Sequence, residues 1–435
     1  MAIYDFNCED YGLISKTVNA FLPKKVIIPL VFDDEKQDNA EIFICEGETV
    51  KEGQVIARTN DSAVHSSIPG TVDKIFETDF ADGRRGLGAL ISLKGSFSYT
   101  GKIPVSLDWT KLEKSNLRFL IADCGIINTF GKNTPLVRQI SSFSSKAFGA
   151  VICRLIPDDP GRITENVLTE NYIEKIITGT MITAKALGAK AIVFARDNAQ
   201  KEIDFSKIEK FDENLEIHQI TLDGKDYPSG FPHELIQAVK NQLKNFEVKK
   251  CGCNELFIDC QTALNVYNGI VEGKPEIFSY IHVSGDCLNA AGVFKVKIGT
   301  LLSDFIEQCG NFKKKPAKII INGKITGWNV ASFDLPVTKG IKSISFVPKN
   351  QIPDEKKVNC IRCGSCHSIC PVGLYPESLL RCGNDEPKDI LVKQTALLCT
   401  ECGLCNSVCP SRIELCQLIS NLKTAKKEVT VDELK

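Results

Sequence analysis

The sequence Cys360-Ile-Arg-Cys363-Gly-Ser-Cys366-His-Ser-Ile-Cys370-Pro371 decides how the last part of this chain folds. The same spacing returns at Cys399-Thr-Glu-Cys402-Gly-Leu-Cys405-Asn-Ser-Val-Cys409-Pro410. Each run reads C-x2-C-x2-C-x3-C-P, a spacing by which thiolates bind [4Fe-4S] clusters in pairs. Three closely spaced thiolates wrap one cluster, and the fourth, beside proline, reaches the other. The two runs therefore predict two clusters in one small domain.

This crossed pattern assigns four cysteines to each cluster. The first set is Cys360, Cys363, Cys366 and Cys409, and the second is Cys370, Cys399, Cys402 and Cys405. Zinc is the alternative, but structural zinc sites usually close one tetrahedron with two separated C-x2-C pairs, so triplets followed by Cys-Pro favour clusters. His367 lies inside the first run, and we expect it beside the cluster rather than bound to it.

Length and composition limit what kind of protein this is. A chain of 435 residues is long enough for about two to four domains. Its formal net charge is -1 without a long basic run, which argues against nucleic acid as a partner. No stretch approaches about 18 apolar residues, and no secretory signal is visible, so no transmembrane segment is expected. Nineteen cysteines without an export signal predict the cytoplasm, with the chain either free or peripheral to a membrane complex.

Residues 20–100 predict a small all-β sandwich. Short strands separated by glycine and proline occur in Glu46–Ala57 and Val64–Ile75. The pattern resembles the lipoyl/biotinyl fold, in which a hairpin carries a modified lysine. The corresponding hairpin here, Arg58–Val64, has no lysine. We therefore expect a scaffold or docking domain rather than a swinging arm.

Residues 115–250 alternate between strands and helices, as in a Rossmann-like α/β domain with a parallel sheet. Buried strands are expected at 117–122, 149–156, 189–195 and 216–222. Apolar residues at helical spacing predict a helix over 173–187, which Gly188 ends.

Residues 251–347 return to shorter strands, which fits a compact β-grasp module. Strands are expected at 281–286, 293–301 and 317–323, and a helix at 303–309. A polar connector then leads into the cysteine-rich domain, which we place at residues 350–420.

The order of these modules resembles that of RnfC, a subunit of the Rnf-type electron transport complex. The matching stretches are the twin cysteine runs and His65–Val72, Tyr227–Gly230, Val283–Gly285, Ile298–Thr300 and Leu335–Gly340. The resemblance covers about residues 20 to 415. It implies a lipoyl-like sandwich, an α/β domain like the FMN- and NADH-binding domain of the complex I flavoprotein, a soluble-ligand-binding (SLBB-like) β-grasp module, and a ferredoxin-like domain with two clusters.

One stretch departs from that family. Members that oxidise NADH carry a glycine-rich loop, G-x-G-G-A-G-F-P-T-x-x-K, whose backbone approaches the flavin phosphate. The corresponding residues 123–138 keep only Gly125, Gly131 and Pro135 of this pattern, and a second family segment is altered at 158–164. This departure from the family implies that FMN and NADH are not bound. The resemblance elsewhere implies that two [4Fe-4S] clusters are the cofactors.

An RnfC-like chain without this loop resembles the proline reductase-associated electron transfer proteins of amino-acid-fermenting anaerobes. That resemblance implies D-proline reductase subunits as partners. Cys251 and Cys253 are then either a redox pair or two ordinary thiols. Cys124 is either a reactive thiol or, as we favour, a small buried hydrophobe. The remaining thiols are expected to have no special role: Cys8, Cys45, Cys153, Cys260, Cys287, Cys309, Cys382 and Cys416.

The sequence favours a protein that passes electrons from a reduced protein donor to a partner reductase, with no catalytic acid–base pair of its own. The first alternative is an FMN-dependent, NADH-oxidising RnfC subunit of an Rnf-type ion-translocating complex. The second is a scaffold that its clusters stabilise. Flavin content distinguishes the first alternative, and whether the clusters can be reduced distinguishes the second.

Overall fold

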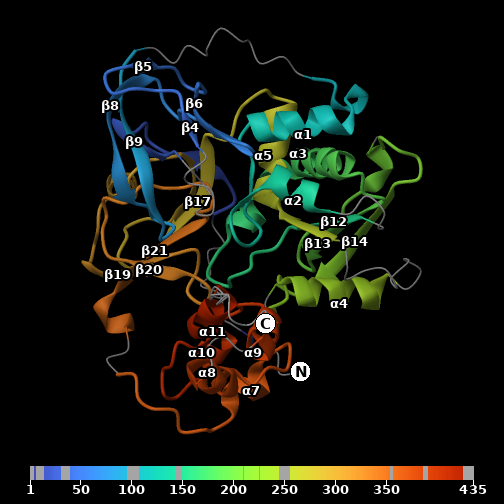
Figure 1. The fold of residues 1–435 in the computed structure, drawn as a ribbon, viewed down its shortest axis with the longest axis vertical. Helices are drawn as coiled ribbons and strands as arrows, with labels where there is room; N and C mark the ends of the chain where they lie inside the picture. Colours follow the sequence, from blue (N-terminus) through green and yellow to red (C-terminus); the bar gives the residue numbers. More distant parts are fainter. Residues whose placement is uncertain are drawn as a thin grey trace, which may run out of the picture.

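The computed structural model describes residues 4–5, 14–30, 40–95, 107–143, 149–208, 210–224, 226–243, 255–352, 356–385 and 390–424. Figure 1 shows a β sandwich in blue, an α/β part in teal to yellow, a second sheet in orange and a helical part in red. The chain is therefore a multidomain α/β and β protein, as the sequence predicts. Within these ranges, no helix has the length and apolar character needed to cross a membrane.

The first part is a sandwich of two antiparallel sheets, with strand orders β3-β9-β8-β5 and β4-β6-β7. The strands are β3 Lys25–Pro29, β4 Glu41–Ile42, β5 Thr49–Val50, β6 Val55–Thr59, β7 Ser62–His65, β8 Gly70–Asp79 and β9 Arg85–Leu93. Apolar side chains from both sheets, among them Ile28, Ile56 and Ile91, form the core between them.

The second part is built around a parallel sheet in the order β14-β13-β12-β16. Its strands are β12 Ala150–Arg154, β13 Ala191–Asp197, β14 Glu216–Leu222 and β16 Glu255–Asp259. The chain runs outward from β12 through β13 to β14 and then returns to place β16 on the other side of β12. The carboxyl ends of β12 and β16 therefore flank the topological switch point, where α/β sheets commonly bind ligands.

Helices cover both faces of this sheet. The helices are α1 Lys114–Asp123, α2 Leu136–Ser142, α3 Thr164–Leu187, α4 Pro232–Gln242 and α5 Cys260–Ile270. One face packs against α1, α2, α3 and α5, and the other packs against α4. A Cβ on Gly179 of α3 would lie 1.8 Å from the Ala263 carbonyl oxygen, so only glycine allows α3 and α5 to lie this close. Gly188 ends α3 in the left-handed conformation, as predicted.

Two expectations about this part are wrong. Residues 117–122 lie within helix α1 and do not form a strand. Leu117 and Ile121, one helical turn apart, are buried, whereas Phe119 between them is 65% exposed. The boundary expected at residue 251 is also misplaced, because β16 pairs with β12 and α5 packs into the α/β core.

The third part is a six-stranded sheet in the order β2-β18-β17-β21-β19-β20. Its elements are β2 Thr17–Asn19, β17 Phe278–Ser284, β18 Gly292–Lys297, α6 Leu302–Gln308, β19 Pro316–Ile321, β20 Trp328–Val330 and β21 Ser343–Pro348. Strand β2 reaches this sheet from before the sandwich and pairs with β18. Two short strand pairs join other segments: β1 Tyr4–Asp5 with β15 Asp226–Tyr227, and β10 Ile127–Asn128 with β11 Thr134–Pro135. Single 3-10 turns occur at Trp109–Lys111, Phe205–Lys207 and Lys349–Gln351.

The C-terminal part is helical and lies at one end of the molecule (Figure 1). Its helices are α7 Ser365–Ile369, α8 Pro376–Asp385, α9 Ile390–Leu397, α10 Leu404–Ser407 and α11 Leu415–Thr424. Helix α7 contacts α10, and α8 contacts α11. The cysteine runs lie in the loops and turns around these helices.

Candidate iron-sulfur site

The C-terminal part contains two halves related by a shift of 39 residues, so that Cys360 corresponds to Cys399 and α7 to α10. The backbone repeats as well. Left-handed φ angles occur at Arg362 (55°) and Glu401 (60°), at Gly364 (78°) and Gly403 (74°), and at Gly373 (68°) and Arg412 (51°). Left-handed residues reverse the course of the chain. They let each loop turn back around a space, whereas a helix continued through these residues would run straight.

The first pocket is lined by residues from both cysteine runs. Cys360, Cys363 and Cys366 of the first run line it, together with Cys409 of the second run. The structure therefore brings together the four cysteines that the sequence assigns to one cluster.

The second pocket has the reciprocal composition. Cys399, Cys402 and Cys405 line it, together with Cys370 of the first run. In the described part of the chain, no group of three or more His, Cys, Asp or Glu side chains is arranged to hold a single metal ion. The cysteines instead stand around the two pockets.

Backbone amides point at the cysteine sulfurs in both halves. The donors and acceptors occupy equivalent positions: Arg362 N to Cys360 Sγ (3.4 Å), Glu401 N to Cys399 Sγ (3.4 Å), Leu374 N to Cys370 Sγ (3.3 Å) and Ile413 N to Cys409 Sγ (3.5 Å). A hydrogen bond to sulfur stabilises the thiolate over the thiol. The repeat thus places the same contacts between amide and sulfur in both halves.

The two pockets differ in their surroundings. Cys360 and Cys363 of the first pocket are exposed, whereas Cys402 and Cys405 of the second are buried. Cys402 packs with Tyr227 and Ile325 of the two preceding parts, and the Tyr227 hydroxyl donates a hydrogen bond to the Cys402 carbonyl oxygen. The first pocket therefore faces solvent, and the second faces the rest of the molecule.

His367 is not among the residues that line either pocket. Its ring stacks on Tyr375, with the ring centroids 3.7 Å apart, and its Nδ1 lies 2.9 Å from the Leu374 carbonyl oxygen. These contacts agree with the expectation that His367 is a neighbour of the site rather than a ligand.

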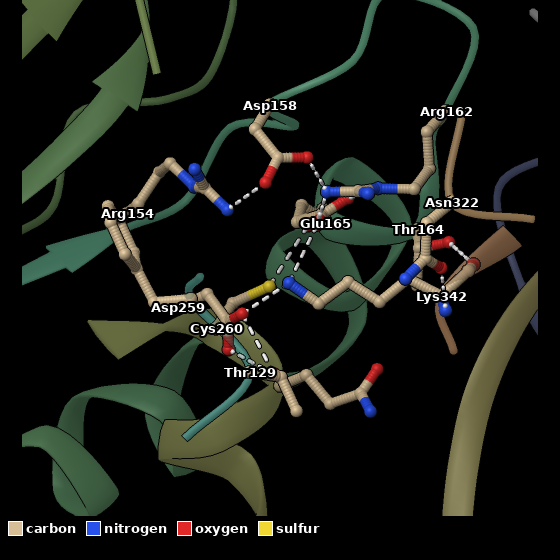
Figure 2. A network of polar contacts seen from close by, with 12 residues as sticks. Thr129, Arg154, Asp158, Arg162, Thr164, Glu165, Asp259, Cys260, Asn322 and Lys342 are labelled. Carbon is tan, nitrogen blue, oxygen red and sulfur yellow. Dashed lines mark hydrogen bonds and ion pairs between the residues drawn. The ribbon is translucent and has the colours of Figure 1, made fainter. Parts of the chain in front are cut away.

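At a second candidate site, the switch point, charged side chains of the chain itself form a network of polar contacts (Figure 2). Arg154 ends β12 and Asp259 ends β16. Arg154 Nη2 donates to Asp158 Oδ2 at 2.8 Å, and Lys342 Nζ pairs with Asp259. Arg162 pairs with both Asp158 and Glu165. Five of these side chains are at most 3% exposed: Arg154, Arg162, Glu165, Asp259 and Lys342.

The charges of this network keep each other ionised. Burial alone would raise the pKa of Asp259, but the Lys342 ammonium and the Arg154 guanidinium outweigh it and lower the pKa to about 2. Burial would likewise lower the pKa of Arg162, yet Asp158 and Glu165 raise it. Removal of any one member would leave a buried charge without its partner.

The residues that correspond to the flavin loop turn inward and complete this network. The Asn128 amide donates to Gln139 Oε1 at 2.6 Å and to the Phe257 carbonyl oxygen at 2.7 Å. The Thr129 hydroxyl donates to Asp259. Phe130 lies against Arg154, whose Cζ is 4.3 Å from the ring centroid. Residues 128–130 are therefore used for internal packing.

The family glycine that remains at position 125 has a packing role. It has a φ of 68°, and a Cβ on Gly125 would lie 2.1 Å from the Ala63 carbonyl oxygen in the sandwich. Lys339 Nζ donates to the Gly125 carbonyl oxygen at 2.5 Å and lies 3.7 Å from Glu276 Oε2. Burial raises the pKa of Glu276 to about 7, although Lys339 opposes the rise. Gly131 has open space around it, and Pro135 pairs with Ile127 between β10 and β11.

The other predicted thiols have different outcomes. Cys124 caps the end of helix α1 and is only partly buried, so the expectation of a buried hydrophobe is met in part: burial raises the pKa of its thiol to about 12, and its Sγ donates to the Gly269 carbonyl oxygen at 3.5 Å. Cys251 and Cys253 lie outside the described residues, so a redox role for them stays a prediction. The expectation that Cys416 has no special place is wrong, because Cys416 lines the second pocket. The 39-residue repeat would have indicated this, since Cys416 corresponds to Glu377, which lines the first pocket.

Known proteins resemble this chain in its N-terminal part and over most of its length. Residues 14–93 match the RnfC barrel sandwich hybrid domain. The RnfC subunit of the proton-translocating ferredoxin:NAD(+) oxidoreductase complex of Clostridium ljungdahlii is 28% identical over 82% of this chain and 78% of that protein. Its counterpart in the Na(+)-translocating ferredoxin:NAD(+) oxidoreductase complex of Acetobacterium woodii is 24% identical over 81% of this chain and 80% of that protein. These similarities support the predicted resemblance to the RnfC family.

Among solved structures, the chain is similar to an NAD+-reducing [NiFe]-hydrogenase in the H2-reduced state, with a TM-score of 0.45 and 14% identity. The match covers 67% of this chain and 52% of that chain, about half of its length. The two relatives from Clostridium and Acetobacterium belong to ion-translocating complexes, so the proline reductase-associated subgroup stays a prediction.

Proposed function

We propose that this chain carries electrons through two [4Fe-4S] clusters, as the RnfC-like member of an ion-translocating electron transport complex of the Rnf type. The observation that carries the proposal is the crossed lining of the two pockets, with Cys409 in the first and Cys370 in the second. That arrangement is the one by which two neighbouring clusters share two cysteine runs. The similarity to the RnfC subunits of ferredoxin:NAD(+) oxidoreductase complexes supports the same role.

The lining of the pockets favours clusters over zinc. A structural zinc site closes one tetrahedron around one ion, with thiolate ligands at about 2.3 Å. Here eight cysteines line two pockets, four to each, and one cysteine of each set comes from the other run. The amides directed at Cys360, Cys370, Cys399 and Cys409 suit cluster ligands, whose sulfurs carry negative charge. When bound, the clusters supply one-electron transfer.

The exposed edge of the first pocket is the place at which a redox partner reaches this chain. Residues 356–364 are all exposed, and within them Val358 and Ile361 are 56% and 65% exposed. The same stretch carries Lys356, Lys357 and Arg362 and no acidic residue, although Asp354 and Glu355 directly precede it in the sequence. An apolar centre with cations around it suits a small acidic electron carrier.

Charge reversal tests this edge. We expect Lys356→Glu/Lys357→Glu to slow reduction of the chain by a small acidic ferredoxin about tenfold or more, because it removes electrostatic steering. The rate constant of the unmodified chain should fall with added salt, and that of the variant much less. Stopped-flow measurement of cluster bleaching gives both. The control Lys51→Glu/Lys94→Glu makes the same charge change on exposed lysines of the sandwich and should leave the rate unchanged. Equal slowing in both variants would contradict this assignment.

The proposed function itself is tested on protein purified without oxygen. We expect about eight iron atoms and a similar amount of sulfide per chain, with EPR signals that appear on reduction. An iron-free protein, a single cluster or bound zinc would refute the proposal. Clusters that resist reduction at every accessible potential would favour the scaffold function.

Oxidation of NADH with FMN is the second candidate, because the relatives belong to ferredoxin:NAD(+) oxidoreductase complexes. The network of charged side chains at the switch point argues against it. Arg154 pairs with Asp158 and Lys342 pairs with Asp259, so these cations are already paired within the chain. Thr129 donates a hydrogen bond to Asp259 in the loop that, for this candidate, would have to bind a phosphate. Release of one flavin per chain on heating, together with bleaching of the clusters by NADH, would establish this second candidate.

The partners follow from the same proposal. Subunits of an Rnf-type complex are the partners that the relatives support, with this chain peripheral to the membrane part. D-proline reductase subunits remain the partner implied by the altered loop. Capture of partners from an anaerobic extract of the source cells distinguishes the two sets.

A further inference from the structure

The two cysteine pockets are built by the same repeat, so their linings can be compared position by position. With the shift of 39 residues, Cys366 corresponds to Cys405 and Glu377 to Cys416. Both members of each pair line their pocket. The repeat thus makes each half a control for the other.

Glu377 and Cys416 are the equivalent positions at which the two linings differ most in chemistry. In the first pocket, Glu377 places a carboxylate in the wall, with its Oε2 3.7 Å from Cys366 Sγ. In the second pocket, Cys416 places a fifth sulfur in the wall. A thiolate is a ligand that iron-sulfur clusters prefer, and a carboxylate is not.

Several contacts hold Cys416 in reach of the other sulfurs. Its side chain lines the second pocket together with those of Cys399, Cys402 and Cys405. Its backbone amide donates to Asn406 Oδ1 at 2.8 Å, which ties the start of α11 to α10. The side chain is only partly exposed. Cys416 is therefore part of the pocket and has the same soft donor atom as its neighbours.

We infer that Cys416 is a reserve ligand of the second cluster, able to replace Cys399 or Cys405, and that the first cluster has no such reserve because Glu377 occupies the equivalent position. This inference rests on the proposed function, since it requires a cluster in each pocket. The two clusters should then differ in how well they tolerate the loss of a ligand. The cluster that faces the rest of the molecule survives the loss of a ligand, and the cluster that faces solvent does not.

The test removes one ligand at equivalent positions of the two halves. Iron per chain and the EPR spectrum of the reduced protein are measured after anaerobic reconstitution. We expect about eight iron atoms in the unmodified chain and about eight in Cys405→Ala, because Cys416 completes the set. Cys405→Ala/Cys416→Ala is expected to hold about four. Cys416→Ala alone should keep about eight, since the four primary ligands remain.

The first half supplies the matched control. Cys366→Ala, the equivalent of Cys405→Ala, is expected to lose its cluster or to keep an incomplete one with an altered EPR signal. Cys366→Ala/Glu377→Cys introduces the fifth thiol in that pocket and is expected to restore about eight iron atoms. Cys399→Ala repeats the test at a second ligand of the same pocket. It keeps the inference testable if Cys405→Ala does not fold.

The outcomes separate this inference from the proposed function. An unmodified chain without iron would refute both. Eight iron atoms in the unmodified chain, with a loss to about four in both Cys405→Ala and Cys399→Ala, would refute the reserve ligand alone.

Discussion

Replacement of Cys409 by alanine is expected to remove the cluster of the first pocket, although Cys409 belongs to the second cysteine run. Cys409 lines that pocket with Cys360, Cys363 and Cys366. Under the proposed function, the variant should lose about half of its iron and no longer accept electrons from ferredoxin, because the cluster nearest to solvent is gone. Its remaining EPR signal should match that of Cys363→Ala.

The comparison that decides this prediction is with Cys402→Ala, which lies in the same run as Cys409 but lines the other pocket. If Cys409→Ala resembled Cys402→Ala instead of Cys363→Ala, each run would hold its own metal and the crossed assignment would be wrong. Cys382→Ala is the control, because Cys382 is exposed and lines neither pocket, and it should keep all of its iron.

Replacement of Lys342 by methionine is expected to destabilise the chain by about 3–5 kcal/mol, because it leaves a buried charge uncompensated. The Lys342 side chain is 3% exposed, pairs with Asp259 and lies 3.6 Å from Glu165. The ammonium is a main reason why the pKa of Asp259 stays low, so its loss leaves the carboxylate buried without its main cation. Urea unfolding followed by circular dichroism measures the change.

Two further variants identify the cause. Lys342→Met/Asp259→Asn removes both charges and should recover part of the loss, which a simple packing defect would not. Arg85→Met removes a cation whose partner Glu77 is 3.9 Å away on the surface, with side chains 69% and 66% exposed, and should leave unfolding unchanged. Equal destabilisation by Lys342→Met and by the double variant would contradict the electrostatic explanation.

Short apolar runs in the α/β part are where the sequence is ambiguous. The run at 149–156 does contain strand β12, whereas the similar run at 117–122 lies in helix α1. A run of this length fits a buried strand and one face of a helix equally well. The difference is decided by what lies beside it: α1 buries Leu117 and Ile121 against the sheet and leaves Phe119 exposed.

Ligand spacing and hydrophobic pattern were enough to predict which eight cysteines gather in two pockets and the α/β and β character of the chain. Spacing is a local property, since a loop that carries three cysteines at intervals of three residues can hardly avoid directing them to one place.

The other features depend on contacts between distant segments. Arg154, Asp259 and Lys342 meet because β16 returns beside β12 and the third sheet closes over the switch point. Cys416 joins the second pocket for a similar reason, because helix α11 packs back against α10 and the other helices of the repeat. No local sequence pattern predicts such long-range contacts.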